Sequence, residues 1–260
     1  MEALNKFGVP FLSYKAIYPI QSIRSFILFR LLDPLIHYLF FAALVSAIAG
    51  TEYLKYIVLG NIVYYTGRTM LFHFMYLLQM ERRFGTLELN IAAPLSTFRI
   101  IFQKGFIPLV DGLFVFIYGL LIGQVLFHLT FPVDQAFSIL LLLIVTLFSM
   151  ISFSMMIACT SLLFSNVNLF SNIMMALLQV FCGVNFSVQL FPAWIQKFVS
   201  FLPLTHSIEA IRSIFHLESS SIYPLLLKEF LIGILYLCIA AILINVMEKL
   251  ARKYASFFKV

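Results

Sequence analysis

The sequence predicts an all-helical integral membrane protein with six transmembrane helices, and two observations lead to that prediction. Of the 260 residues, 62% are hydrophobic and 11% are charged, whereas soluble domains have roughly 45–50% apolar and about 25% charged residues. The apolar residues also gather into long runs, and a helix needs a run of about 20 to cross a bilayer. A soluble fold of this length would require far more polar surface.

The apolar runs place the spans within a single transmembrane domain over 1–260. We expect spans at 31–49, 54–80, 102–129, 136–164, 169–186 and 223–247. Residues 14–30 then form an N-terminal interfacial helix, and 31–186 hold the first five spans. Residues 187–222 form a re-entrant extracellular pair of short helices before the last span, and 248–260 form a cytoplasmic tail.

The segment before the first span is amphipathic. Ile20, Ile23 and Ile27 recur at helical spacing while polar residues take the other face, as in helices that lie in the membrane interface. Asp33-Pro34 then marks the bend into the span, because a residue before proline avoids the helical conformation. The alternative is a simple extension of the first span. Residues 1–21 do not resemble a cleaved signal peptide, so we expect the first span to be retained.

The basic residues orient the domain. With the N-terminus in the cytoplasm, only Lys55, Lys197, Arg212 and Lys228 lie outside, and Arg68 falls within a span. The cytoplasmic set comprises Lys6, Lys15, Arg24, Arg30, Arg82, Arg83, Arg99, Lys104, Lys249, Arg252, Lys253 and Lys259. This positive-inside bias puts both termini in the cytoplasm. The net charge of +6 therefore reflects topology, and we expect no nucleic-acid partner.

The connection after the second span has the pattern of a short cytoplasmic helix. Gly85 can end the span with a positive φ, and Thr86 can cap a new helix that carries Glu88 in its first turn. Pro94 stops that helix after about two turns. A rigid helix here can transmit motion from a partner protein to the two spans that it joins. An ordinary loop is the equally weighted alternative.

The segment between the fifth and sixth spans is too interrupted to cross the membrane. Pro192 and Pro203 divide it, Trp194 suits the interface, and the charges are Lys197, Glu209 and Arg212. After Pro203, Thr205 can cap a helix that carries an apolar stripe. Glu209 and Arg212 are three residues apart and can form an ion pair on that helix. We therefore expect two short helices dipping into the outer leaflet.

Three ionisable residues are expected inside the membrane. Arg68 lies 13 residues before Glu81, roughly 20 Å along a helix, where a charge is costly. It either lines a translocation path, pairs with another helix, or extends towards the outer interface. Asp111, in the third span, can pair with Arg68 or with Lys104. His73 does not share the face of Arg68.

The chain shows no pattern of a metal site. Cys159, Cys182 and Cys238 each lie in an apolar run, where cysteine is usually a small packed residue. His206 and His216 have no carboxylate or cysteine partner at ligand spacing. We therefore expect neither a metal site nor a disulfide.

Two motifs resemble a known family. The run ERRFGTLE (Glu81, Arg82, Arg83, Phe84, Gly85, Thr86, Leu87, Glu88), followed by the APLS that contains Pro94, resembles the E-R-x-x-G-T-L-E…P-L-S pattern of ABC-2 type ABC transporter permeases. The run LFPAWI (190–195) and LPLTHSIEAIR (202–212) resemble the family's second signature. Together with the six-span layout, the motifs cover nearly the whole chain.

The resemblance implies a transport subunit rather than an enzyme. In that family the first motif is the coupling helix that docks on the ATPase, and the second forms re-entrant extracellular helices. No G-x-x-x-x-G-K-[ST] phosphate loop occurs, so ATP and Mg would be bound by a separate ATPase, two per complex. A second permease, identical or homologous, and membrane lipid complete the expected partners. A bacterial inner membrane is the implied location.

The resemblance leaves the cargo open among drugs, antibiotics, lipids, peptides and glycans, with hydrophobic, amphipathic or lipid-linked molecules expected. A secondary carrier coupled to ions or protons is the alternative, and it predicts inverted repeats and acidic residues at mid-membrane. We see no repeat. An intramembrane enzyme would need clustered His, Asp or Glu, and the five histidines are scattered.

Overall fold

The computed structural model describes residues 27–85, 97–161 and 167–254, and these ranges are helical with no strand. The all-helical prediction is therefore confirmed for the described residues. A π-helical turn (Ile27–Leu32) leads into the first of the α-helices, and short 3-10 turns precede α4, α8 and α10. The helices are α3 (Asp33–Ala49), α4 (Leu54–Arg83), α6 (Thr97–Lys104), α7 (Phe106–Phe127), α8 (Ala136–Ser161), α9 (Val167–Phe181), α10 (Ala193–Val199), α11 (Thr205–Ile214) and α12 (Ile222–Tyr254).

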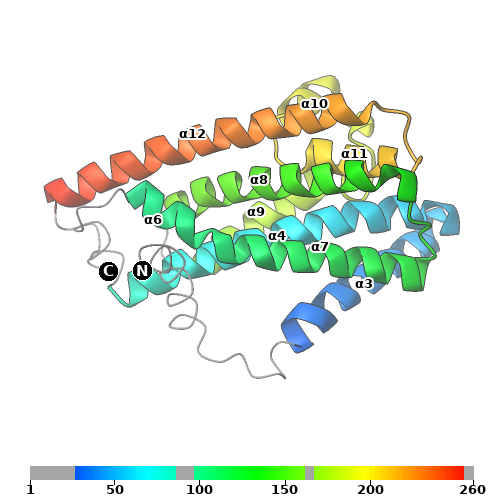
Figure 1. The fold of residues 1–260 in the computed structure, drawn as a ribbon, viewed down its shortest axis with the longest axis horizontal. Coiled ribbons are helices and arrows are strands. Elements are labelled where there is room, and N and C mark those ends of the chain that lie inside the picture. Colours follow the sequence, from blue (N-terminus) through cyan, green and yellow to red (C-terminus); the bar gives the residue numbers. More distant parts are fainter. Residues whose placement is uncertain (1–26, 86–96, 162–166, 255–260) are drawn as a thin grey trace.

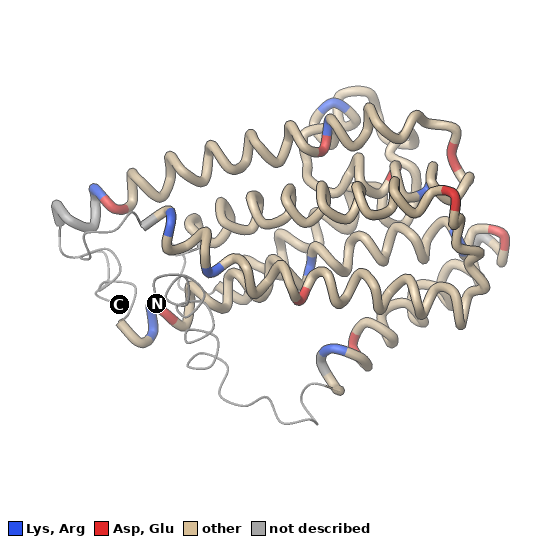
Figure 2. The backbone as a smooth tube through the Cα atoms, in the orientation of Figure 1, with Lys and Arg blue, Asp and Glu red and all other residues tan. Residues whose placement is uncertain are grey.

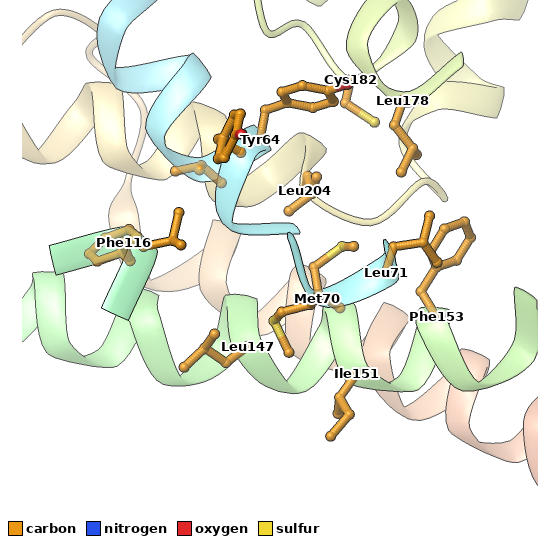
Figure 3. Close-up of a cluster of buried hydrophobic side chains, with 14 of the residues drawn as sticks. Tyr64, Met70, Leu71, Phe116, Leu147, Ile151, Phe153, Leu178, Cys182 and Leu204 are labelled. Carbon is orange, nitrogen blue, oxygen red and sulfur yellow. The ribbon is translucent and has the colours of Figure 1, made fainter. Parts of the chain in front are cut away.

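Helix α4 forms the centre of the bundle. It packs against α3, α7, α8, α9 and α11, and most of its residues are buried. Figure 1 shows the long helices side by side, with the short helices α10 and α11 near one end. In Figure 3, side chains of α4 such as Met70 and Leu71 lie among Phe116, Leu147 and Leu178 from three neighbouring helices. The core therefore surrounds α4 rather than lying between two layers.

Helices α3 and α12 form the outside of the bundle. Ile36 and Ile48 of α3 are 62% and 78% exposed, and Leu227 and Ile242 of α12 are 59% and 62% exposed. Large apolar side chains exposed along a whole helix are unfavourable in water and favourable in lipid. These faces therefore fit a multi-pass membrane protein, with lipid covering both helices.

Four of the six expected spans have the length and apolar composition to cross a membrane: 30–48, 98–127, 133–160 and 222–249. Helix α4, with 30 residues, is long enough but too polar, because its neighbours rather than lipid surround it. Helix α9 has 15 residues, fewer than the roughly 20 that a span requires. The six-span topology therefore stays a prediction at α4 and α9.

Several helix ends differ from the sequence predictions. The third expected span breaks at Gly105, because Pro108 has no N–H for the carbonyl of Lys104. The fifth is shorter than 169–186, since Gly183 adopts a φ of 74° just after α9. The second ends as predicted, with Gly85 at a φ of 69°. Residues 14–26 of the predicted interfacial helix lie outside the described residues.

Candidate functional site

Asp111 lies at the centre of a buried ionic cluster that joins three segments. The residue is 4% exposed, and its Oδ1 accepts a hydrogen bond from the Arg30 guanidinium. Its Oδ2 lies 2.7 Å from Nδ1 of His73. Arg30 comes from the turn before α3, His73 from α4 and Asp111 from α7. The cluster therefore attaches the start of the first helix to the core.

Both partners proposed for Asp111 from the sequence are wrong. His73 is the residue of α4 that lies beside Asp111. Arg68 lies five residues before His73, and five residues turn a helix by about 500°. The two side chains therefore lie on different faces of α4. Lys104 instead pairs with Glu81. The spacing of Lys104 and Asp111 assumed one continuous helix, whereas the helix breaks at Gly105. Sequence spacing also carries no information on Arg30, which approaches from another segment.

Arg68 forms a second ionic contact beside the first. Its Nη1 lies 3.8 Å from Oδ2 of Asp33, and the two side chains are 31% and 50% exposed. The Tyr65 hydroxyl donates to the same carboxylate, and the guanidinium lies 4.9 Å from the centre of the Tyr65 ring. This pair opens onto the surface of the single chain near the middle of α4, where hydrocarbon would not solvate it.

A third polar contact lies one turn further along α3, at His37. Nε2 of His37 is 3.0 Å from Oδ1 of Asn61. The Asn61 amide donates to Oδ1 of Asn185 at 3.1 Å and to the carbonyl of Ile57 at 2.9 Å. Taken with the Arg30 and Asp33 contacts, polar side chains attach the start and the first turns of α3 to its neighbours. We call these contacts the polar seam.

The predicted ATPase-coupling residues divide into two groups. Glu81 is 3% exposed and pairs with Lys104 of α6, so it stabilises the bundle from within. Arg83 is exposed at the end of α4, Arg82 is partly buried, and Gly85 forms the turn. Thr86, Leu87, Glu88 and Pro94 lie outside the described residues, and so does the helix predicted for them.

The second predicted pair, Glu209 with Arg212, is replaced by other contacts. Arg212 is 2% exposed, and it donates to the carbonyls of Tyr56 at 3.1 Å and Val184 at 2.8 Å. Its Nη1 lies 4.0 Å from Oε1 of Glu218, while Glu209 accepts from Ser220 at 2.7 Å. Because α11 packs inside the bundle, carbonyls of other segments reach Arg212.

Pro192, Trp194 and Pro203 of the predicted re-entrant segment lie beside or on the short helices α10 and α11. Pro192 directly precedes α10, and Trp194 is 73% exposed on it, as expected for a residue at an interface. The carbonyl of Pro203 accepts from Sγ of Cys182 at 3.1 Å. All residues of α11 except Glu209 are buried. Helix α11 thus folds back onto the bundle, and the membrane depth of both short helices stays a prediction.

Sequence reasoning missed Glu229, a fully buried carboxylate of α12. Its Oε1 accepts from Ser149 Oγ at 2.6 Å and from the backbone N–H of Leu204 at 2.9 Å, and Oε2 accepts from the N–H of Ser207 at 3.3 Å. These backbone donors belong to the first turn of α11, whose N–H groups have no partners within the helix. Glu229 therefore caps α11.

The prediction that Thr205 caps α11 is wrong, because Glu229 caps this helix instead. Oγ1 of Thr205 donates to the carbonyl of Val199 at 3.0 Å, and Leu204, with a φ of 73°, precedes the helix. The available signal was an acidic residue within an otherwise apolar span, since such residues in spans usually have a structural or functional role.

The comparisons with known proteins agree with this architecture. The family model described as ABC-2 type transporter matches residues 15–216, which is most of the chain and includes both motifs. A search of curated proteins finds no match. The chain therefore belongs to the ABC-2 type transporter family, whose members are the membrane-embedded transport subunits of ABC transporters.

Proposed function

We propose that this chain is the permease subunit of an ATP-driven exporter for hydrophobic, amphipathic or lipid-linked molecules. Family membership carries the transport role. The outward direction and the class of cargo rest on the motif resemblance and on the apolar composition of the chain. The chain carries no phosphate loop, so a separate ATPase would hydrolyse ATP. The positive-inside bias supports cytoplasmic termini in a cell membrane.

The surface at Arg68 supports the pairing of two permeases. The Arg68–Asp33 contact is open on the single chain and lies about 20 Å from either end of α4. A charged pair at this depth requires water or protein around it. In the proposed complex, a second permease covers this surface or shares a water-filled path with it. Two ATPases would bind on the cytoplasmic side, at the segment 86–94.

In the proposed mechanism, ATP binding changes the population of inward- and outward-open states. The ATPases close on ATP and push the predicted coupling helix, which follows α4 in the sequence after Gly85. Because α4 contacts five other helices, a displacement of its end changes contacts throughout the bundle. Each ligand acts by binding one state better than the other, and no covalent step occurs on this chain.

The experiment that tests the function pairs the chain with its candidate ATPase in lipid. We expect the permease to copurify with the ATPase and to alter its rate of ATP hydrolysis. Glu88→Arg, which reverses a charge in the coupling motif, should abolish that effect while the variant still inserts. Glu52→Arg is the matched control, because Glu52 is exposed in the turn before α4. If the intact chain neither binds nor alters the ATPase, the exporter proposal is wrong.

A further inference from the structure

Two neighbouring chambers lie near the N-terminal end of α4, away from Arg83. The outer chamber has a volume of about 1060 Å³ and lies between α3, the start of α4 and the segments 185–190 and 216–220. The inner chamber, of about 230 Å³, lies against α10 and α11. Tyr56, Ser187, Gln189 and Glu218 line both chambers. The outer chamber alone matches the size of small-molecule sites, about 300–1,000 Å³.

The two chambers differ in chemistry. Leu44, Val45 and Ile48 of α3 form an apolar wall of the outer chamber. The inner chamber has more polar and charged side chains in its lining, beside Cys182, Val188 and Ile208. The polar and charged side chains include Gln196, Ser200, Thr205, His206, Glu209, Arg212 and Glu218. A molecule that fills both chambers therefore has an apolar tail and a polar head.

Several hydrogen-bond donors of the inner chamber are already used. Arg212 donates to the carbonyls of Tyr56 and Val184. The Gln196 amide donates to the carbonyls of Gln189 at 3.1 Å and Phe191 at 2.7 Å. The Thr205 and Ser200 hydroxyls also donate to backbone carbonyls. A head group that mainly accepts hydrogen bonds, such as a phosphate or sulfate, would find these donors occupied and would be left with the buried Tyr56 hydroxyl, which has no hydrogen-bond partner among the described residues.

One acceptor among the residues that line the inner chamber has no partner. Nε2 of His206 lies 3.1 Å from the carbonyl of Ser200, and a carbonyl only accepts, so Nε2 carries the proton. Burial lowers the pKa of His206, which keeps the ring neutral and leaves Nδ1 as an acceptor. That atom is buried without a hydrogen-bond partner among the described residues. A buried polar atom without a partner is costly, and a donor on a ligand would satisfy it.

The charges of the inner chamber favour a cation. Two carboxylates, Glu209 and Glu218, line it against one guanidinium, Arg212, so its formal charge with neutral His206 is −2 + 1 = −1. The guanidinium is occupied by two carbonyls and by the Tyr56 ring, 3.5 Å from the ring centre. A cationic head that donates hydrogen bonds would meet the unpartnered His206 nitrogen, the Glu209 carboxylate and the Glu218 carboxylate, whose Oε1 also lies 4.0 Å from Nη1 of Arg212.

We propose that the paired chambers bind an amphipathic amine, with its tail against α3 and its protonated amino group in the inner chamber. The proposal deepens the proposed function and rests on it for the direction of transport. In the proposed orientation, this end of the bundle faces outwards, where an exported molecule is released. The site lies within one chain and does not require a second permease.

The test measures binding by calorimetry to the full chain in lipid nanodiscs, with empty nanodiscs as the background. Decylamine, decyl glucoside and decyl sulfate share one tail and differ only in the head group. We expect decylamine to bind at least about tenfold more tightly than either of the others. Equal binding of decylamine and decyl sulfate would overturn the proposal, and so would tighter binding of the glucoside.

Two variants connect the binding to the chambers. Glu209→Gln removes a charge but keeps an oxygen that can accept from Ser220, so the fold should persist while decylamine binds about tenfold more weakly. Glu52 is an exposed acidic residue that lines neither chamber. The Glu52→Gln variant should therefore bind decylamine as the parent does. Unchanged binding by Glu209→Gln would exclude this site.

ATPase stimulation, measured on the same nanodiscs, separates this proposal from the proposed function. Selective amine binding without any effect on the ATPase would leave the site standing and contradict the exporter role. ATPase stimulation without amine selectivity would leave the exporter role standing and contradict the site.

Discussion

Asp111 and Glu229 are both buried carboxylates within the bundle, yet different groups satisfy them. Asp111 is held by side chains, the Arg30 guanidinium and the His73 ring. Glu229 is held by Ser149 and by two backbone N–H groups of α11, and no Lys or Arg in the described part of the chain forms an ion pair with it. Figure 2 shows how few charged residues lie between the ends of the bundle.

The difference separates an exchangeable contact from a fixed one. A carboxylate paired with a long cationic side chain can change partners, because the side chain can rotate to another acceptor. A carboxylate that accepts from the first turn of a helix can be released only if that helix moves or unfolds. We therefore expect α8, α11 and α12 to move as one unit. Helix α3, attached by the polar seam and exposed along its outer face, is the element best suited to move.

The largest expected effect comes from Glu229→Leu. The change leaves the N–H groups of Leu204 and Ser207 and the Ser149 hydroxyl without their acceptor, and each buried unsatisfied group costs about 1–3 kcal/mol. We expect a loss of about 3 kcal/mol or more in the free energy of unfolding. Glu229→Gln, which keeps an acceptor oxygen, should lose about 1–2 kcal/mol.

The thiol of Cys182 reports this loss directly, because it is buried and donates to the carbonyl just before Leu204. In a chain with Cys159 and Cys238 replaced by alanine, maleimide should label Cys182 much faster after Glu229→Leu. If Glu229→Leu labels no faster than the parent, the carboxylate does not hold α11 in place.

The next effect concerns the exchangeable pair. Asp111→Asn removes the carboxylate beside Arg30 and His73, and we expect it to lose about 2 kcal/mol of stability, since breaking a buried pair leaves a charge uncompensated. Arg30→Gln combined with Asp111→Asn should recover part of that loss. Chemical unfolding of the two single variants and the double variant gives the coupling energy, which should be about 1 kcal/mol or more.

The pair also predicts a functional difference between the two carboxylates. If α3 moves during transport, Asp111→Asn should change ATPase stimulation more than Glu229→Gln does at comparable stability. Equal changes in both variants would contradict the view that the seam is the moving contact.

The smallest expected effect is Ser149→Ala, which removes one of the donors to Glu229. The remaining backbone donors still hold the carboxylate, so we expect a loss of about 1 kcal/mol in the free energy of unfolding. Thermal unfolding followed by circular dichroism measures it. A loss as large as that of Glu229→Leu would mean that Ser149, rather than the helix terminus, dominates the contact.

The sequence was most informative where local rules decide the structure. Gly85 ends its helix with a positive φ as predicted, because only glycine adopts that conformation without strain. The apolar runs gave α3, α7, α8 and α12 because lipid-facing helices must be apolar over a bilayer's thickness. They do not settle α4 as a span, since a helix surrounded by other helices can keep buried polar residues such as Asn61.

The sequence by itself determined the helical class, the approximate places of the helices, and the motifs of the ABC-2 type transporter family. Only the tertiary structure decided which charges meet: Arg30 with Asp111, Lys104 with Glu81, and Glu229 with the start of α11. The physical reason is that helix periodicity fixes the face of each residue on its own helix. The neighbour of that face depends on how separate helices pack, and the paired chambers exist only because distant segments meet at the end of α4.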